Sequence, residues 1–243
     1  MRSWWSLPSE VVLPSLRDAS VLRRCLVLTA LSFALLLAPA FTIHAAENWV
    51  PLADTGGSEV EVSVVRSDMS GLVLEVTVPG LDVATVDTPR GAFTSLSLEG
   101  AGSSQTIGEA LLPVIREFIE VPHGAEPVVE RVEASYERAA LQELGISHPL
   151  VPVQAPVEKI PGALEAAPFS YSETYYSRSS FGPQESASIG PVRVIREHRF
   201  VQLEVNPFRY NPVGGELEYA TGMRVTVAFE GSDETETRRV YER

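Results

Sequence analysis

The stretch from Val205 to Tyr219 restricts the possible fold more than any other part of the chain. Pro207 and Pro212 lack a backbone donor and fix φ near −65°, which excludes a regular helix and a central strand. The residue before each proline is driven toward an extended conformation. Gly214-Gly215 then allows positive φ in a tight turn. The sequence therefore predicts an extended edge segment, a turn, and a return strand that begins at Glu216.

Strand patterns dominate the chain after its first 46 residues. Runs in which apolar and polar residues alternate predict antiparallel strands, and Gly- and Pro-rich breaks predict the turns. The predicted strands cover residues 59–64, 72–78, 92–98, 114–121, 127–137, 192–205 and 223–229, with a hairpin turn at 67–71. The only helix candidate here is Glu137–Leu144, followed by Gly145 as a cap. The pattern predicts an all-β fold, an antiparallel β-sandwich or a jelly-roll-like arrangement.

Residues 147–191 differ in composition from the strands around them. Seven prolines interrupt this segment, and Ser- and Tyr-rich pieces lie between them. A stretch of this length without periodic apolar runs is either disordered or a long functional loop. Its aromatic residues, Tyr171, Tyr175, Tyr176 and Phe181, favour a loop that makes contacts, because disordered segments are poor in aromatics.

The N-terminus has the pattern of an export signal. Arg23-Arg24 precedes an apolar run from Cys25 to Ala38, which fits the helical core of a signal peptide and is shorter than the roughly 20 residues of a membrane span. Residues 1–46 are therefore predicted to be a signal peptide, with an over-long leader if translation starts near Val21; a membrane anchor is the alternative. The candidate cleavage positions are Ala40, Ala45 and Ala46. We expect an exported protein, periplasmic or extracellular, with no stable membrane insertion after signal removal.

The predicted mature part has no cysteine and is acidic. Cys25, the only cysteine, lies in the signal core, so we expect neither a disulfide nor a thiolate nucleophile. From Glu47 onward there are 30 Asp and Glu against 15 Lys and Arg, a formal charge of −15. This charge disfavours nucleic acids and anionic membranes as partners.

Catalytic and metal-binding patterns are absent from the sequence. There is no G-x-S-x-G, H-E-x-x-H or Walker motif, and the histidines are too scattered to form a close pair. The sequence thus predicts a protein that is not an enzyme and has no cofactor or metal. The sequence does not exclude calcium binding, because hard oxygen ligands can come from scattered acidic residues. Such residues are Asp82, Asp87, Glu216 and Glu218.

Several short motifs occur in the order seen in one known family. An apolar run ends in the V-P-x-G-A turn of residues 121–125, a P-x-Q-x-P segment covers 152–156, and Arg193 and Arg196 form an R-x-x-R pair on the predicted strand 192–205. The Y-N-P run of residues 210–212 is the most specific of these motifs. Together, over residues 50–231, they resemble the propeptide domain of the gingipain-type (family C25) cysteine peptidases. The catalytic domain, with its His and Cys, is not in the sequence.

The resemblance implies a function as well as a β-sandwich. Such a pro-domain, residues 47–231, inhibits a gingipain-like cysteine peptidase domain, normally in cis, and assists its folding. In this chain the Pro-rich loop at 147–191 is the candidate to cover the active-site cleft. On position and charge, and not on a motif match, Lys159, the single lysine of the chain, or Arg178 would fill a pocket for a basic side chain. Residues 232–243 would be an exposed polar linker toward the missing peptidase domain, and the candidate processing sites are Arg238, Arg239 and Arg243.

A second interpretation is a stand-alone extracellular binding or adhesion module built on a β-sandwich. Exposed aromatics would then stack on a glycan or pack against a protein surface. The residues expected to do so are Tyr171, Tyr175, Tyr176 and Tyr210.

Overall fold

The structure is a computed structural model and describes residues 48–54, 56–161 and 163–242. The predicted signal peptide, its candidate cleavage positions Ala40, Ala45 and Ala46, and the candidate processing site Arg243 lie outside these residues. Among the described helices, none has the length and apolar character needed to cross a membrane.

Antiparallel strands make up most of the described chain. They are β1 (Asn48–Pro51), β2 (Glu61–Asp68), β3 (Gly71–Thr77), β4 (Gly80–Thr88), β5 (Gly91–Ser97), β6 (Gly102–Ser103), β7 (Pro113–Val121), β8 (Glu126–Ala134), β9 (Glu137–Ala140), β10 (Ala187–Ile189), β11 (Arg193–Ile195), β12 (His198–Val205), β13 (Phe208–Asn211), β14 (Glu216–Tyr219) and β15 (Gly222–Glu230). The helical segments are short: the 3-10 turn η1 (Leu141–Leu144), α2 (Ala163–Ala166), α3 (Glu173–Tyr176) and α4 (Glu234–Tyr241). The all-β prediction is confirmed.

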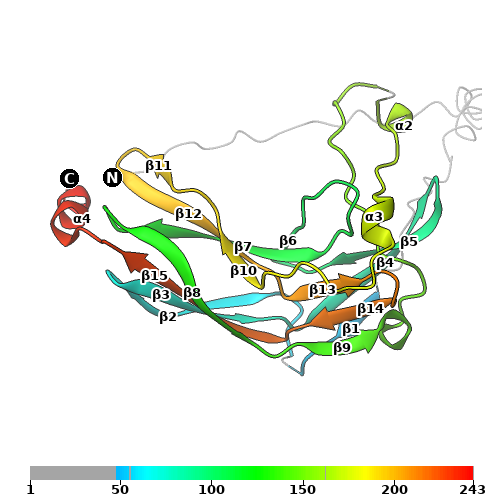
Figure 1. Ribbon diagram of the computed structural model, residues 1–243, viewed down its shortest axis with the longest axis horizontal. Helices are drawn as coiled ribbons and strands as arrows, with labels where there is room; N and C mark the ends of the chain where they lie inside the picture. The colour runs from blue at the N-terminus through cyan, green and yellow to red at the C-terminus, as the bar shows by residue number, and fades with distance from the viewer. Residues whose placement is uncertain (1–47, 55, 162, 243) are drawn as a thin grey trace, which may run out of the picture. The chain divides into compact units, whose positions relative to one another are not determined.

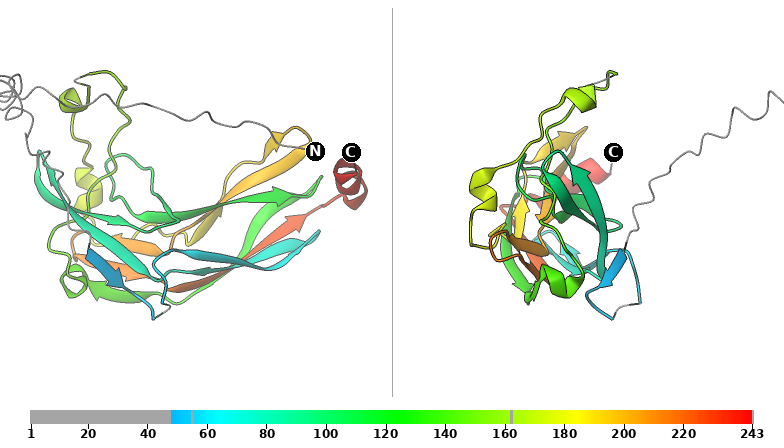
Figure 2. Two further views of the ribbon diagram at one scale, coloured as in Figure 1. Left: turned by 180° about the vertical axis from the view of Figure 1, so that it is seen from behind. Right: turned by 90° about the vertical axis from the view of Figure 1, so that its right-hand side faces the viewer.

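Two hydrogen-bonded layers face each other across the core (Figures 1 and 2). One has the strand order β2-β3-β15-β8, and the other has the order β10-β12-β7-β6, with β11 folded back on β12. The small sheets β1-β4-β5 and β13-β14-β9 lie at the end of the body opposite α4. This arrangement is the antiparallel sandwich that the sequence predicts.

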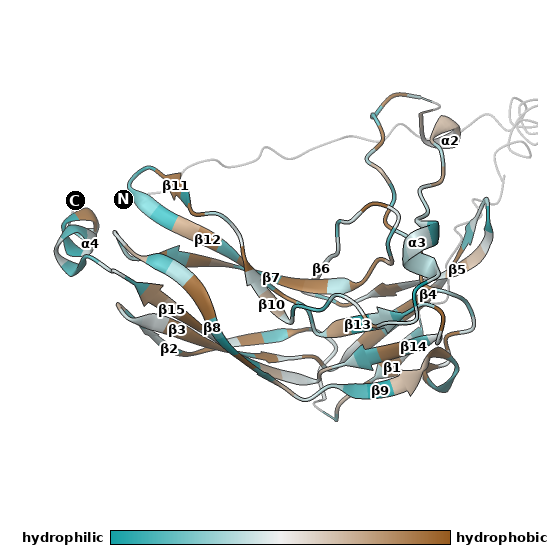
Figure 3. Ribbon diagram, in the orientation of Figure 1, coloured by the Kyte–Doolittle hydropathy of each residue, from teal (hydrophilic) through white to brown (hydrophobic). Residues whose placement is uncertain are grey.

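The core lies between the layers and follows from the alternation along each strand. Ile115 and Leu203 from one layer join the same hydrophobic cluster as Val76 and Val225 from the other. Bands of hydrophobic and hydrophilic residues alternate along β8 and β14 in Figure 3. Each fully buried aliphatic side chain contributes about 1.5–3 kcal/mol relative to exposure, so burial stabilises this fold without a disulfide among the described residues.

The stretch after Val205 forms the predicted hairpin. β13 pairs with β14 from Phe208↔Tyr219 to Asn211↔Glu216, and β13 is the edge strand of its sheet. The Asn211 side chain accepts a hydrogen bond from the Gly214 backbone amide at 3.1 Å. Gly215 has a φ of 60°, a conformation that glycine adopts without a Cβ penalty.

Two predicted elements differ in the structure. The predicted single strand 192–205 is wrong: β11 and β12 are two strands joined by a turn at Arg196 and Glu197, and Arg196 has a φ of 53°. The predicted helix Glu137–Leu144 is also wrong, because its first half is strand β9 paired with β14 and its second half is η1. Gly145 caps η1 in the left-handed region, as predicted.

The tail and the long Pro-rich segment are more ordered than an exposed linker or a disordered loop. Residues 234–241 form helix α4, in which Thr237 and Val240 are buried. In the segment 147–191, Leu150, Val151 and Tyr175 are core residues. Where the sequence predicts an exposed polar linker at 232–243, the structure has a helix over residues 234–241 with two buried side chains.

Candidate functional site

The start of the Pro-rich segment is held on the body by backbone hydrogen bonds. Residues 149–153 run beside β5 and residues 109–111: Val151 N–H donates to the Thr94 carbonyl, and Leu111 N–H donates to the Val151 carbonyl, both at 2.8 Å. Leu150, the residue before Val151, is fully buried. This stretch therefore behaves as an additional strand and fixes where the following loop begins.

A cluster of hydrogen bonds closes the loop of residues 155–169, which we call the projecting loop. The Gln154 side-chain amide donates to the Ser170 carbonyl at 3.1 Å, and its oxygen accepts from the Ser170 backbone amide at 2.9 Å. Ala155 N–H donates to the Ser170 hydroxyl at 3.3 Å. Figure 1 shows the two limbs leaving the body together and α2 at their far end. Gln154 thus anchors both ends of the projecting loop.

An aromatic cluster supports the returning limb. Tyr171 stacks on Tyr176 with ring centroids 4.3 Å apart, and Phe93 of β5 contacts Phe169 and Tyr171 at 5.9 and 6.3 Å. The guanidinium of Arg90 lies over the Tyr171 ring at 4.3 Å and also pairs with Glu173 at 2.7 Å. These contacts fix the end of the projecting loop to the β4–β5 turn and to α3.

Two tyrosines at this base lie in a largely apolar environment. The Tyr176 hydroxyl donates to the Leu150 carbonyl at 2.7 Å. Burial raises the pKa of Tyr175 to about 12 and also raises the pKa of Tyr176, with the neighbouring phenol of Tyr175 adding to the second shift. Both side chains therefore stay neutral at physiological pH and serve packing and hydrogen bonding.

The candidate Lys159 lies on the projecting loop and is exposed, as are its neighbours Glu158 and Ile160. Among the described residues, Lys159 makes no hydrogen bond or ion pair. Its ammonium group is therefore presented to the surroundings from a loop whose two ends are fixed.

The candidate Arg178 occupies a different position. Its guanidinium lies 4.0 Å over the Tyr175 ring, and its carbonyl accepts a hydrogen bond from Val213 N–H at 3.3 Å. Its Nε is buried and has no hydrogen-bond partner within the described residues. Arg178 follows α3 on the body, so the structure does not bring the two candidate residues together.

The candidate processing residues Arg238 and Arg239 lie in α4. Their side chains are exposed, but each is paired with a glutamate of the same helix: Arg238 with Glu234 at 2.6 Å, and Arg239 with Glu236. The backbone at both positions is helical rather than extended.

The acidic residues that left calcium open in the sequence lie on separate strands. Asp82 and Asp87 are on β4, whereas Glu216 and Glu218 are on β14, where Glu218 pairs with Arg138 at 2.8 Å. The described residues contain no group of three or more His, Cys, Asp or Glu side chains placed to hold a metal ion.

The tyrosines expected to be exposed in a binding module are largely inside. Tyr210 and Tyr175 belong to the core, and Tyr176 is half-buried. This expectation is wrong, because Tyr175 and Tyr210 are buried in the core and the Tyr176 ring stacks on Tyr171 instead of lying on a free surface.

Sequence reasoning missed the residues that hold the projecting loop. Gln154 was visible as the middle residue of the P-x-Q-x-P motif, although nothing local to the motif showed that its amide bonds Ser170. The contributions of Arg90 and Phe93 come from a distant hairpin, and no pattern in the segment itself indicates them.

Comparison with known proteins identifies the family. The family model Propeptide_C25 matches residues 53–240, which includes most of α4. Lys-gingipain HG66 and Lys-gingipain W83 of Porphyromonas gingivalis are each 33% identical over 163 residues, or 67% of this chain. The chain spans about 9% of the length of these relatives.

Two solved structures have the same fold. A structure described as giving insight into the zymogenic latency of gingipain K from Porphyromonas gingivalis has a TM-score of 0.68 and 26% identity, and the match covers 76% of this chain and all of that one. The complex of the pro- and mature domains of RgpB from Porphyromonas gingivalis has a TM-score of 0.60 at 19% identity, covering 74% of this chain and 94% of the other, and shows the fold alone. The chain belongs to the C25 propeptide family and is a non-catalytic propeptide domain of the gingipain type.

Proposed function

We propose that this propeptide domain keeps a gingipain-like cysteine peptidase inactive by covering its active-site cleft with the projecting loop. Lys159 occupies the pocket that receives the basic side chain of a substrate. The peptidase is the domain that follows in the same precursor, and the chain assists its folding. The precursor is exported to the periplasm or the cell exterior.

The observation that carries the proposal is the exposed Lys159 on a loop with fixed ends. Gln154 and Ser170 close the base of the loop, and the Tyr171 and Tyr176 rings support its returning limb. An inhibitor that enters a cleft loses less conformational entropy when its loop is held before binding. Such a loop can block a peptidase cleft sterically, which requires no catalytic group in the loop.

The names of the relatives support lysine as the residue that enters the pocket. They are called Lys-gingipains, and the single lysine of this chain lies on the projecting loop. Arg178 is a weaker candidate, because its guanidinium is stacked on Tyr175 and would have to leave the body to reach a cleft.

The test is inhibition of a lysine-specific gingipain by the purified chain. We expect Lys159→Ala to raise the inhibition constant by about 30-fold or more, the effect of losing a central contact worth about 2 kcal/mol. Lys159→Arg should weaken inhibition of a lysine-specific peptidase and strengthen inhibition of an arginine-specific one.

Glu158→Ala is the matched control, since Glu158 is an exposed neighbour on the same loop. It should inhibit like the unaltered chain. Equal inhibition by the unaltered chain and by Lys159→Ala would reject Lys159 as the residue in the pocket.

A further inference from the structure

Helix α4 is bonded to the turn between β7 and β8 through a closed set of hydrogen bonds. Asp233 N–H donates to the His123 carbonyl at 2.6 Å, and His123 N–H donates to the Thr237 hydroxyl at 2.9 Å. The Thr237 hydroxyl in turn donates to the Asp233 carbonyl at 2.6 Å. Gly124, with a φ of 74°, permits this approach, because a Cβ there would lie 2.9 Å from the Gly231 carbonyl oxygen.

The helix is also held at its two ends. At the start, the Asp233 carboxylate caps α4 by accepting a hydrogen bond from Glu236 N–H at 2.9 Å. At the end, the Tyr241 ring lies edge-on to His198 with centroids 5.5 Å apart, and His198 pairs with Glu120 of β7 at 2.7 Å. Figure 2 shows α4 beside the ends of β12 and β7. Between these contacts, Thr237 and Val240 are buried.

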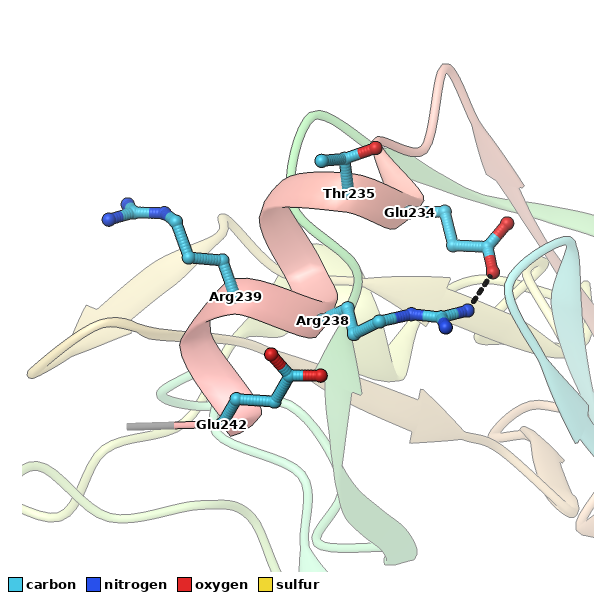
Figure 4. A pocket seen from close by; sticks show the side chains of 5 residues that line it. All are labelled: Glu234, Thr235, Arg238, Arg239 and Glu242. Carbon is cyan, nitrogen blue, oxygen red and sulfur yellow. Dashed lines mark hydrogen bonds and ion pairs between the residues drawn. The ribbon is translucent and has the colours of Figure 1, made fainter.

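The bonds that follow Arg238 and Arg239 lie inside this held helix. Figure 4 shows the two arginine side chains extending from opposite sides of α4, with Arg238 directed at Glu234. The side chains are therefore accessible while the backbone is hydrogen-bonded and helical. Peptidases prefer exposed, locally disordered chain, and a folded site is cut through a transiently opened state.

We infer that α4 is a gate on proteolytic processing. Cleavage after Arg238 or Arg239 requires release of α4 from the β7–β8 turn. The two hydrogen bonds of the Thr237 hydroxyl contribute most to holding α4 on that turn. The peptidase of the proposed function takes a lysine side chain in its pocket, so cleavage after Arg238 or Arg239 would need a second peptidase that cuts after arginine. The gate itself depends only on the fold, so it also acts on any peptidase that cuts after arginine. The rate of processing would then be set by the release of α4, and exposure of the arginine side chains alone would not be sufficient for cleavage.

The experiment measures the initial rate at which trypsin cuts the C-terminal bonds of the purified chain. Intact-mass analysis separates the products, since cleavage after Arg238 removes residues 239–243 and cleavage after Arg239 removes residues 240–243. A synthetic peptide of residues 230–243 gives the rate of the unfolded sequence. We expect the chain to be cut at these bonds at least about tenfold more slowly than the peptide.

Thr237→Val should accelerate cleavage at these bonds about fivefold, because it removes the hydroxyl from both of its hydrogen bonds and raises the population of the open helix. Thr235→Val is the matched control: it makes the same chemical change on the exposed side of α4, as labelled in Figure 4, and should leave the rate unaltered. Thr237→Ser keeps the hydroxyl, so this variant should be cut at a rate within about twofold of that of the unaltered chain.

Cleavage after Arg224, inside β15 between β3 and β8, reports unfolding of the whole body and separates it from local release of α4. The inference is supported if Thr237→Val accelerates the C-terminal cuts without accelerating the Arg224 cut. It is overturned if Thr237→Val and Thr235→Val are cut at the same rate, if both classes of cut accelerate together, or if the unaltered chain is cut as fast as the peptide. Trypsin can also cut after the exposed Lys159. The rates of the C-terminal cuts do not depend on whether Lys159 enters a peptidase pocket, so this outcome is independent of the inhibition test.

Discussion

Tyr176 combines an apolar position with a satisfied polar group. Its ring stacks on Tyr171 under the projecting loop, and its hydroxyl donates to the carbonyl of the fully buried Leu150. A buried hydroxyl without a hydrogen-bond partner would destabilise the fold, and the Leu150 carbonyl removes this cost by accepting the hydrogen bond of the Tyr176 hydroxyl. One side chain therefore links the start of the Pro-rich segment to α3.

Tyr176→Phe should lower the free energy of unfolding by about 0.5–1.5 kcal/mol, the net value of one hydrogen bond. Urea unfolding followed by circular dichroism measures this change. Tyr219→Phe is the control, because the Tyr219 hydroxyl reaches an exposed Glu137 carboxylate only at 3.4 Å. Equal effects of the two substitutions would show that the Leu150 contact adds nothing.

The conformation of the projecting loop depends more on the hydrogen bonds that close its base than on packing of its own side chains. Most of residues 154–161 are exposed, and the hydrogen bonds between Gln154 and Ser170 fix the ends. Under the proposed function, we therefore expect the loop to determine inhibition and the sandwich to determine stability.

Gln154→Ala should weaken inhibition of a lysine-specific gingipain by about five- to 30-fold, because a loosened loop must be ordered on binding. The melting temperature should change little, since the bonds lie at the exposed edge of the body. Gln142→Ala, an exposed glutamine on η1, should alter neither quantity. Unchanged inhibition by Gln154→Ala would mean that closure of the loop does not prepare it for binding.

The elements that sequence reasoning missed are those decided by distant contacts. The turn at Arg196 and Glu197 has no glycine, proline or asparagine, and a non-glycine residue at positive φ is uncommon. The turn is contacted from the β7–β8 turn, where the His123 ring nitrogen lies 2.9 Å from the Glu197 carbonyl. No local pattern reports that contact. In the same way, pairing with β14 overrides the helix propensity of the stretch Glu137–Ala140.

For the whole molecule, two layers with an apolar interior follow from the alternation that the sequence displays. The hairpin from Phe208 to Tyr219 and the strand pairs around it were predictable, because turn residues and period-two runs are local signals. For the candidate site, the sequence indicated the segment and Lys159, but not the closure by Gln154 and Ser170 or the helix that holds Arg238. These features require segments far apart in the chain to meet.

The buried phenols make the stability of the whole molecule sensitive to alkaline pH. Burial raises the pKa of Tyr175 to about 12 and also raises the pKa values of Tyr176 and Tyr210, whereas an unfolded tyrosine titrates near 10. The folded state keeps protons that the unfolded state loses, so this stability is complete below pH 10 and falls as the pH rises toward 12.

The loss attributable to Tyr175 should approach roughly 2 kcal/mol at pH 12. Urea midpoints measured from pH 8 to 11.5 should decline most steeply above pH 10, with a shallower decline for Tyr175→Phe. Absorbance at 295 nm should show part of the seven tyrosines ionising only with unfolding. Ionisation of all seven near pH 10 in the folded chain would contradict the assignment.

The amide of Gln154 joins the two limbs of the projecting loop at one point, and this has an evolutionary consequence. The residues beyond that point can be replaced or extended without disturbing the sandwich, since doubling the length of a flexible loop costs only about 0.6 kcal/mol. Recognition can therefore diverge while the scaffold stays constant. Under the proposed function, the same scaffold would serve inhibitors of many different peptidases, because only the residues of the projecting loop would need to change.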